Sequence, residues 1–331
     1  MNLRIVLSDR QAVARGELSN ILSGQWASVL NGAGAAVFTL DSDDSLNIAQ
    51  MLTAAPLLTV YSDAGNWGGV ISGSITQSGS RISIRALSNE ALLSGRLTAR
   101  TDNQDDKTNG VIAQALLEAA NATWPTLVTV GSFIYTGGLS HWYEIHHDDL
   151  LERFQDMAET DGQDFEVTWD RKLMWYERRG TDKPNVVLAE GRNVIQYPSY
   201  TYSEAAIVND QILMGEGATW ATRITARSQN STSQNVYGLR QHMQNFGDIS
   251  IQATLDLRAE TFLAAKKYPE QLLSLSIVNR PDGIFSAFEI GDRVRVILPS
   301  YKFGQGFDET VRVIGSELNT DDVMRVVVEV S

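Results

Sequence analysis

The chain has 331 residues and a formal net charge of −13, from 27 Lys and Arg against 40 Asp and Glu, and this acidic balance opposes general binding to DNA or to an anionic membrane. It contains no cysteine, which excludes disulfide bonds, thiolate metal sites and a thiol nucleophile. The polar start lacks the apolar core of a leader peptide, and no apolar run approaches the ~18 residues of a membrane span. We therefore expect a soluble protein that does not insert into membranes.

Short strand-like runs separated by Gly- and Ser-rich turns fill residues 1–101. The last run alternates Ile82, Ile84 and Ala86 with polar residues, which is the period of a strand with one buried face. Regularly spaced short strands of this kind predict a β-barrel or β-sandwich of about 100 residues.

The stretch NGAGAAVFTL, residues 31–40, comes within one residue of the glycine spacing of a dinucleotide-binding loop. A phosphate site needs a helix that begins directly after the glycines, but β-favouring residues follow Gly34, and Val37 stands where a third Gly or Ala is needed. The pair Asn31-Gly32 is instead typical of a hairpin turn. We therefore predict two antiparallel strands here and no bound cofactor.

A run of polar residues and glycine at 100–110 predicts a linker. Beyond it, helix-period apolar stripes predict helices near 111–124 and 148–162, the second capped by Asp148 or Asp149 and ended by Gly162. Two strands of a hairpin come next. Residues 102–198 are therefore predicted to form a small α/β insert.

Strands return from residue 199 onward and are interrupted by one predicted helix at 254–268, so residues 199–331 are predicted to form a second β-barrel with one helix. Residues 70–84 align without gaps on 312–326, which sets Gly73 on Gly315 and Ile82 on Met324. Each segment is a strand, a polar turn and a strand near the end of a β-rich block. The alignment therefore indicates an internal duplication.

The densest group of titratable residues is HWYEIHHDD, which contains His141, Glu144, His146 and His147. The histidine spacings do not match the helical pair of a zinc protease, and neighbouring residues of a strand point to opposite faces. We therefore expect a helix-entry segment with surface histidines, and leave open whether His141, His146 and His147 bind a ligand.

Other candidates for chemistry are weaker still. Paired acids at 43/44, 105/106, 148/149 and 321/322 lie at predicted caps, turns and linkers, whereas glycoside hydrolysis needs carboxyl groups that face each other across a cleft. No Gly-x-Ser-x-Gly elbow is present to carry a nucleophilic serine. The sequence therefore predicts no catalytic, cofactor-binding or metal-binding residue, and no enzyme.

Aromatic residues gather at two places where they could stack on a ligand or pack inside the protein. We expect packing at both. The first group, near the start of the second barrel, is Tyr197, Tyr200 and Tyr202, and the second, in the insert, is Trp124, Trp142, Trp169 and Trp175.

Several segments together resemble the central hub proteins of tailed-phage baseplates and tail tips. LNGAGAAVFTLDSDD resembles that family's opening glycine, β run and acidic turn, and LLTVYSDAGNWGGVISGSI resembles its strand pair. ALSNEALLSGRLTAR is similar to the segment that closes its first barrel, and the stretch from HHDDLLERF to MWYERRGTD is similar to its helix and hairpin. AEGRNVIQYPSYTYSEAAIVNDQILMGEG and FEIGDRVRVILP are similar to its second-barrel strands.

The resemblance implies a β-rich α+β fold with two tail-tube-like β-barrel domains, 1–101 and 199–331, around the small α/β domain 102–198. It implies a structural hub of a tail tip or baseplate in the virion, assembled in the host cytoplasm as a homotrimer whose six barrels meet a hexameric tube or distal tail ring. Tape-measure and tip or fibre proteins are further implied partners, and DNA passes through without specific binding. No catalytic residue is carried over from the family.

Three further expectations belong to this interpretation. Carboxylates lining the ring would repel passing DNA and keep it from adhering. A glycan-binding or hydrolytic tail enzyme, acting through the histidine segment or the tyrosines near Tyr200, is one alternative function. A tube or distal-ring subunit of similar barrel fold is another, which the middle insert disfavours because a plain tube subunit needs one barrel.

Overall fold

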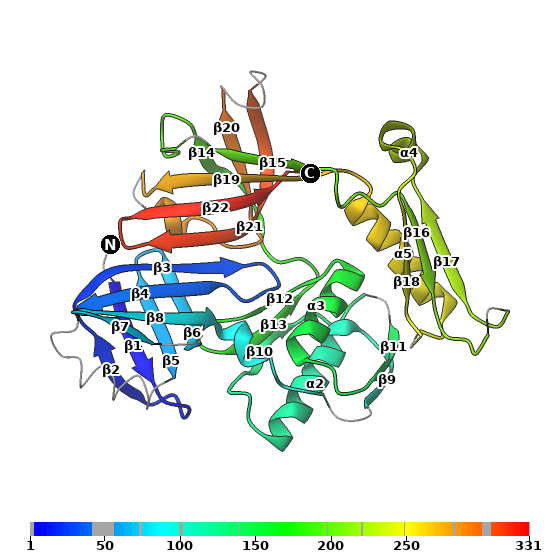
Figure 1. Ribbon diagram of the computed structural model, residues 1–331, viewed down its shortest axis with the longest axis horizontal. Coiled ribbons are helices and arrows are strands. Elements are labelled where there is room, and N and C mark those ends of the chain that lie inside the picture. The colour runs from blue at the N-terminus through cyan, green and yellow to red at the C-terminus, as the bar shows by residue number, and fades with distance from the viewer. Residues whose placement is uncertain are drawn as a thin grey trace.

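The computed structural model describes residues 3–41, 56–72, 75–98, 102–138, 140–196, 198–219, 221–247, 249–280, 283–299 and 306–330. It shows the predicted β-rich α+β fold, with one large, mostly antiparallel sheet, three small sheets and a few helices (Figure 1). None of the described helices is long and apolar enough to cross a membrane.

The large sheet joins strands from both ends of the chain. Its N-terminal strands are β1 (Leu3–Ser8), β2 (Ala14–Leu18), β3 (Ile21–Val29), β4 (Ala35–Asp41), β5 (Leu57–Ser62), β6 (Gly65–Ile71), β7 (Thr76–Ser78) and β8 (Arg81–Ser88). Its C-terminal strands are β14 (Asp182–Ala189), β15 (Ser199–Ser203), β19 (Glu270–Val278), β20 (Arg293–Leu298), β21 (Phe307–Asn319) and β22 (Val323–Glu329). The two halves meet where β3 pairs with β21, from Val29 opposite Gly315 to Gln25 opposite Asn319.

One hydrophobic core lies under both halves of the sheet. Phe38 and Ile84 from the first half and Leu275 and Val326 from the second are buried in the same cluster. The side chains between them, such as that of Arg85, face away from the core, as the alternation of the sequence predicts. The two halves are therefore parts of one packed layer.

The middle module, defined here as residues 102–177, has a core of its own. It contains β9 (Asp102–Lys107), α2 (Asn109–Thr123), β10 (Thr129–Ile134), β11 (His141–Ile145), α3 (Leu150–Asp161), β12 (Asp164–Val167) and β13 (Lys172–Tyr176). The predicted limits of α3 are confirmed, because the Asp149 carboxylate accepts bonds from the first-turn amides and Gly162 ends the helix at a φ of 65°.

Two details of this region differ from the prediction. The polar run expected to be a linker forms β9 from Asp102 onward and pairs with β11, because a backbone ladder does not require apolar side chains. Strand β14, expected within the insert, belongs to the large sheet, where it pairs with β20. The domain boundaries at 101 and 198 stay a prediction.

Residues 204–269, called the arm here, form a further unit that the sequence did not predict. The arm contains β16 (Asp210–Met214), β17 (Thr225–Gln229), α4 (Ser231–Tyr237), β18 (Gln241–Asn245) and α5 (Gln252–Lys266), with a separate core around Leu213 and Leu255. It projects from the body (Figure 1). Because Ser203 and Glu270 lie opposite each other in the β15–β19 ladder, the arm is an insertion at the end of a hairpin.

Candidate functional site

The two halves of the large sheet repeat one arrangement of strands. In the first half, β4 pairs with β8 over residues 35–41 and 81–87. In the second half, β19 pairs with β22 over residues 272–278 and 323–329. The residue numbers of these two segments, 81–87 and 323–329, differ by the same offset as Ile82 and Met324, which the sequence alignment places together. Strands β8 and β22 therefore occupy equivalent positions.

The neighbouring hairpins repeat as well. Residues 57–62 pair with 65–70 in β5–β6, and residues 293–298 pair with 307–312 in β20–β21. The internal duplication indicated by the sequence is therefore confirmed by the hydrogen-bonded register. The aligned Gly73 lies outside the described residues. Strand β7 matches β21 with a displacement of one residue, because the step from Ile71 to Thr76 is one residue longer than the equivalent step from Val313 to Glu317, which contains the bulge of β21.

The first strands of the two units, β3 and β15, also occupy equivalent positions. Trp26 lies opposite Ala36 in β3–β4, and Tyr200 lies opposite Leu273 at the corresponding point of β15–β19. The connections after these strands differ, because a short turn joins β3 to β4 whereas the arm joins β15 to β19. The duplicated sheet therefore carries one unduplicated insertion.

The strand ends consequently form two unlike rims. The far rim, which is the end of the sheet opposite the arm, carries the β7–β8 turn and the β21–β22 turn at equivalent positions of the two units. Gly79 and Asp322 in these turns have positive φ angles of 59° and 56°. At the near rim, one unit has the turn at residues 30–34 and the other has the arm. One rim thus presents two similar hairpin turns per chain and the other presents a single arm.

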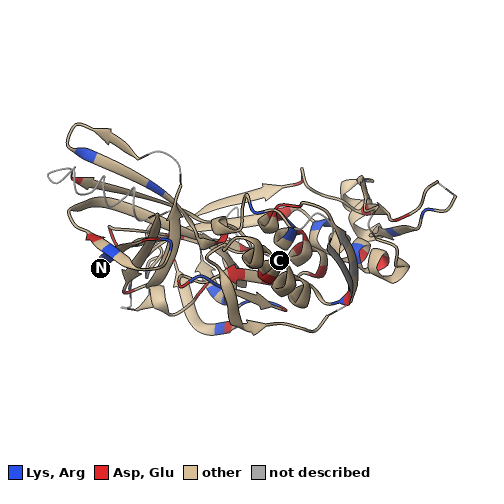
Figure 2. Cartoon of the chain, turned by 90° about the horizontal axis from the view of Figure 1, so that it is seen from below, with Lys and Arg blue, Asp and Glu red and all other residues tan. Residues whose placement is uncertain are grey.

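The face of the sheet that points away from the core carries balanced charges. Asp41 lies opposite Arg81 in β4–β8, and Glu317 lies opposite Arg325 in β21–β22. Arg325 also donates a hydrogen bond of 2.8 Å from Nε to Ser274 Oγ. The acidic excess of the chain is concentrated elsewhere, because residues 102–198 hold 17 Asp and Glu against 8 Lys and Arg, whereas residues 1–101 hold seven of each. Figure 2 shows the acidic and basic segments along the chain.

The turn between β3 and β4 anchors the middle module to the near rim. Asn31, at a φ of 55°, donates from Nδ2 to the Gln163 carbonyl at 3.3 Å, and its Oδ1 accepts from the Phe165 amide at 2.8 Å. Gln155 of α3 donates to the Asn31 carbonyl at 3.0 Å. The hairpin predicted at Asn31-Gly32 is confirmed, and the hydrogen bonds of its turn attach the middle module to the large sheet.

Asp164, at the start of β12, connects three parts of the chain. Its carboxylate accepts from Asn31 Nδ2 at 3.2 Å and from the Arg179 amide at 2.6 Å, and it forms an ion pair with Arg312 of β21. The side chains of Asp164 and Arg312 are 3% and 12% exposed. This buried pair therefore fixes the middle module to both halves of the sheet.

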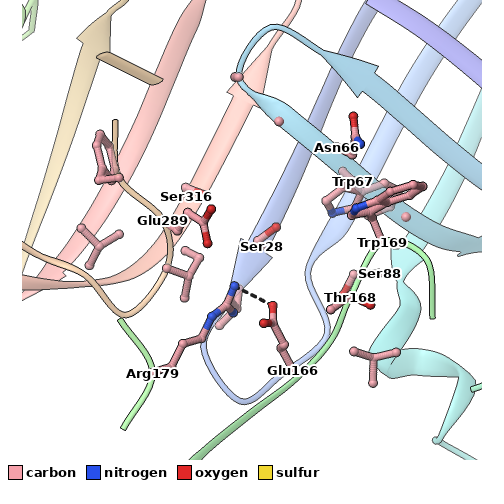
Figure 3. Close-up of a pocket in the computed structure, with 18 of the residues that line it drawn as sticks. Ser28, Asn66, Trp67, Ser88, Glu166, Thr168, Trp169, Arg179, Glu289 and Ser316 are labelled. Atoms are coloured by element: carbon pink, nitrogen blue, oxygen red, sulfur yellow. Dashed lines mark ion pairs between the residues drawn. The ribbon is translucent and has the colours of Figure 1, made fainter. Parts of the chain in front are cut away.

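A cavity of about 380 Å³ lies at the same three-way junction (Figure 3). Glu166 and Arg179 form an ion pair of 2.6 Å at this cavity, and Trp67 of β6 and Trp169 also line it. Gly68 is required here, because a Cβ atom at this position would come within 2.3 Å of the Trp169 carbonyl oxygen. The junction is thus a closely fitted contact with a small polar hollow.

Glu90 is a further buried acid of the junction. Its carboxylate accepts from Ser88 Oγ at 2.5 Å and from the Val167 amide at 3.0 Å, while Ser88 Oγ accepts from the Gly34 amide at 2.8 Å. Burial raises the pKa of Glu90, although the hydrogen bonds from Ser88 and Val167 oppose this effect. The chain of bonds links the β3–β4 hairpin to β12.

The histidine segment differs from the expectation at one residue. His141 is completely buried, with Nε2 at 3.0 Å from Asp161 Oδ2 and its ring stacked on Tyr143, so it is not a surface histidine. The physical reason is that His141 lies on β11, whose alternate side chains face the module core. His146 and His147 are exposed, as predicted. Among the described residues no three His, Asp or Glu side chains are placed to hold a metal ion.

The expectation that the aromatic residues pack inside the protein holds for only some of them. Packing is confirmed for Trp175, which is completely buried, and for Tyr200, which packs against the main core, but it is wrong for Trp124, whose surface is 68% exposed. Tyr202 lies beside the arm, and burial, Tyr237 and Glu204 raise its pKa to about 12. Tyr197, Asp43 and Asp44 lie outside the described residues, as do the side chains of Trp142, Glu144 and Asp105.

Sequence reasoning missed the junction residues. The contact of Asp164 with Arg312 and that of Glu90 with Val167 each join residues far apart in the chain. The one available signal was an Asp at the start of an apolar strand, which is also a common feature of turns.

No protein-family model and no curated protein sequence matches the chain. Solved structures do match, and a tail protein from Neisseria meningitidis MC58 is similar over 100% of this chain and 97% of that chain, with a TM-score of 0.72 and 15% identity. The 43 kDa tail protein of prophage MuSo2 from Shewanella oneidensis is similar over 99% and 98%, with a TM-score of 0.69 and 13% identity. A type VI secretion component of E. coli, described as similar to the T4 tail proteins gp27 and gp5, is similar over 99% and 76%, with a TM-score of 0.56 and 13% identity. The chain therefore has the fold of phage tail proteins.

Proposed function

We propose that this chain, which has the fold of phage tail proteins, is a structural hub of a tail tip or baseplate in the virion. Three copies form a ring that joins a hexameric tail tube or distal tail ring to the tip proteins. The observation that carries the proposal is the repeated sheet unit, because one chain holds two units of the same register. Three chains then present six like units to a sixfold partner. A tube or distal-ring subunit would need only one unit, which favours the hub.

The unlike rims support a change of symmetry between the two ends of the ring. The far rim has two corresponding turns per chain and would meet the tube, since three chains place six similar turns there. The near rim has one arm and one middle module per chain, and would offer threefold sites to tip, fibre or tape-measure proteins.

The charge pattern supports passage of DNA without specific binding. Opposite charges in facing positions give the exposed sheet face little net potential, so it neither attracts nor strongly repels phosphates. This replaces the expectation that carboxylates line the ring, since the acidic excess belongs mainly to residues 102–198. We propose a structural role for the described residues and assign none of them to catalysis.

The test is the assembly state of the purified full chain. We expect mass measurement in solution to give a trimer, alone or with rings of a tube protein, and electron microscopy to show a rim with near-sixfold features. A chain that stays monomeric at every concentration and does not join tube rings would contradict the hub.

A further inference from the structure

A cleft of about 790 Å³ lies where the arm joins the large sheet, and its lining is mainly apolar. The sheet contributes Val29, Leu272 and Ile314, and the arm contributes Ala265, near the end of α5, and Tyr268. The arm meets the sheet beside the C-terminal end of β22 (Figure 1). Val29 and Tyr268 are 47% and 48% exposed, so part of this apolar surface faces solvent.

The apolar residues on the sheet side do not belong to the core face. Leu273 is completely buried in the main core, so its neighbour Leu272 points to the opposite face of β19. Elsewhere this face carries charges such as that of Arg325. On the arm side, Ala264 and Ala265 are exposed and small, so a partner can approach the last turn of α5 closely. An apolar hollow within a polar face is typical of an interaction site.

Two carboxylates lie in the same cleft. Glu329 is opposite Leu272 in the β19–β22 ladder, and Glu270 is two residues before Leu272, so all three side chains share one face of the sheet. Glu270 and Glu329 are exposed, and neither forms an ion pair within the described part of the chain. Lys266 also lines the cleft, but its ammonium group pairs with Glu159 of α3 at 3.5 Å. The cleft therefore carries a negative charge beside its apolar surface.

We propose that this cleft binds a segment of a tip protein that places an apolar side chain beside two Lys or Arg residues. The inference rests on the proposed function, because it names the partner chemistry of the near rim. The apolar side chain would pack against Leu272 and Ala265, and the basic residues would face Glu270 and Glu329. A volume of about 790 Å³ lies in the range of sites that enclose a drug-sized ligand, so it holds a few side chains and not a folded domain.

Charge selects this occupant among the alternatives. Nucleic acid and anionic membranes carry negative charge, which the two carboxylates repel. A second copy of the chain is also acidic overall, with a net charge of −13. A basic segment is attracted by the same carboxylates, and its apolar side chain removes the surfaces of Val29 and Tyr268 from water.

Short capped peptides provide the first test on the purified full chain. Isothermal titration would compare acetyl-Trp-Leu-Lys-Lys-amide with acetyl-Trp-Leu-Glu-Glu-amide, which reverses the charges, and with acetyl-Ser-Asn-Lys-Lys-amide, which lacks the apolar side chains. We expect the first peptide to bind about tenfold more tightly than either control, because two exposed charge pairs and a buried apolar side chain each contribute. Added salt should weaken its binding. Similar affinities of all three peptides would overturn the proposal.

Substitutions of the two carboxylates locate the binding. Glu270→Gln with Glu329→Gln should weaken binding of acetyl-Trp-Leu-Lys-Lys-amide by about fivefold. The matched control, Glu118→Gln with Glu260→Gln, removes the same charge at exposed positions of α2 and α5 outside the cleft, and should leave the affinity unchanged. Equal losses in both double variants would trace the effect to net charge and overturn the site.

Ala265→Arg provides a steric test, because it fills the cleft from an exposed position of α5. We expect loss of peptide binding with an unchanged circular dichroism spectrum and unchanged self-association. A folded variant that no longer associates with itself would show that a second copy covers the cleft, which overturns the proposal.

The outcomes separate the cleft from the hub. If the chain assembles with tube rings but binds the three peptides alike, the cleft proposal is overturned and the hub stands. If the basic peptide binds as expected but the chain never assembles, the hub is overturned, and with it the tip protein as occupant of the cleft.

Discussion

The carboxylate of Asp164 is shared by three parts of the molecule, so its charge has an unusually large structural effect. Removing one partner of a buried ion pair leaves the other charge uncompensated. We expect Asp164→Asn to lower the free energy of unfolding by about 3 to 5 kcal/mol, measured by chemical denaturation, because Arg312 would remain buried. The control is Glu17→Gln, which removes an exposed pair with Arg4 and should cost less than about 1 kcal/mol. Equal effects of the two changes would contradict this role of Asp164.

The raised pKa of Glu90 predicts that its contribution to stability is lost as the pH rises, whereas the contribution of an ion-paired surface acid is lost as the pH falls. Because its folded pKa is raised, the native state holds the proton more tightly, so this contribution to stability is full below the ordinary pKa and is lost as the pH rises through the raised value. Glu90→Gln keeps a neutral side chain in place at every pH. We therefore expect the variant to gain stability over the unaltered chain as the pH rises from 4 to 8, measured by unfolding at each pH.

The control for Glu90 is Glu118→Gln, at an exposed position of α2. Its stability difference from the unaltered chain should stay nearly constant over the same range. A Glu90→Gln curve that is parallel to that of the unaltered chain would show that this carboxyl titrates normally.

At the scale of elements, Asn31 contributes to the β3–β4 turn in two ways, which different substitutions can separate. Asn31 provides both a positive φ and three hydrogen bonds to the middle module. Asn31→Gly keeps the turn and removes the bonds, whereas Asn31→Ala also strains the backbone. We expect the Phe165 amide to exchange hydrogen faster in both variants, and Asn31→Ala to be less stable than Asn31→Gly by roughly 1 kcal/mol. Unchanged hydrogen exchange at the Phe165 amide would show that the hydrogen bonds of Asn31 are not needed to hold the middle module in place.

Local pattern predicted the elements whose formation depends on nearby residues. The hairpin at Asn31-Gly32, the capped helix α3 and the alternating strand β8 follow from turn chemistry, capping and period, and all are confirmed. Strand β9 was missed because its pairing uses the backbone of a polar segment, and the arm was missed because its strands have the same short period as those of the sheet. Long-range contacts such as Asp164 with Arg312 leave no local pattern, so the junction could not be predicted.

At the scale of the whole molecule, the arm is an insertion in only one of the two repeated units of the sheet, so it occurs once per chain. The arm contacts α3 mainly through charged side chains, with Arg258 at 2.7 Å from Asp156 and Lys266 at 3.5 Å from Glu159. Its core remains separate from those of the middle module and the sheet. The arm is therefore an addition to the body, and the body should fold without it.

This independence predicts the result of removing the arm. Replacing residues 204–269 by Asn-Gly connects Ser203 to Glu270, which are already opposite each other, through a turn suited to antiparallel strands. We expect the shortened chain to keep the β-rich circular dichroism spectrum and to assemble as the full chain does, because the core of the sheet does not include residues of the arm. It should lose only binding to near-rim partners, measured by pull-down of tip proteins. A shortened chain that folds but no longer assembles would show that the arm is needed to hold the copies together.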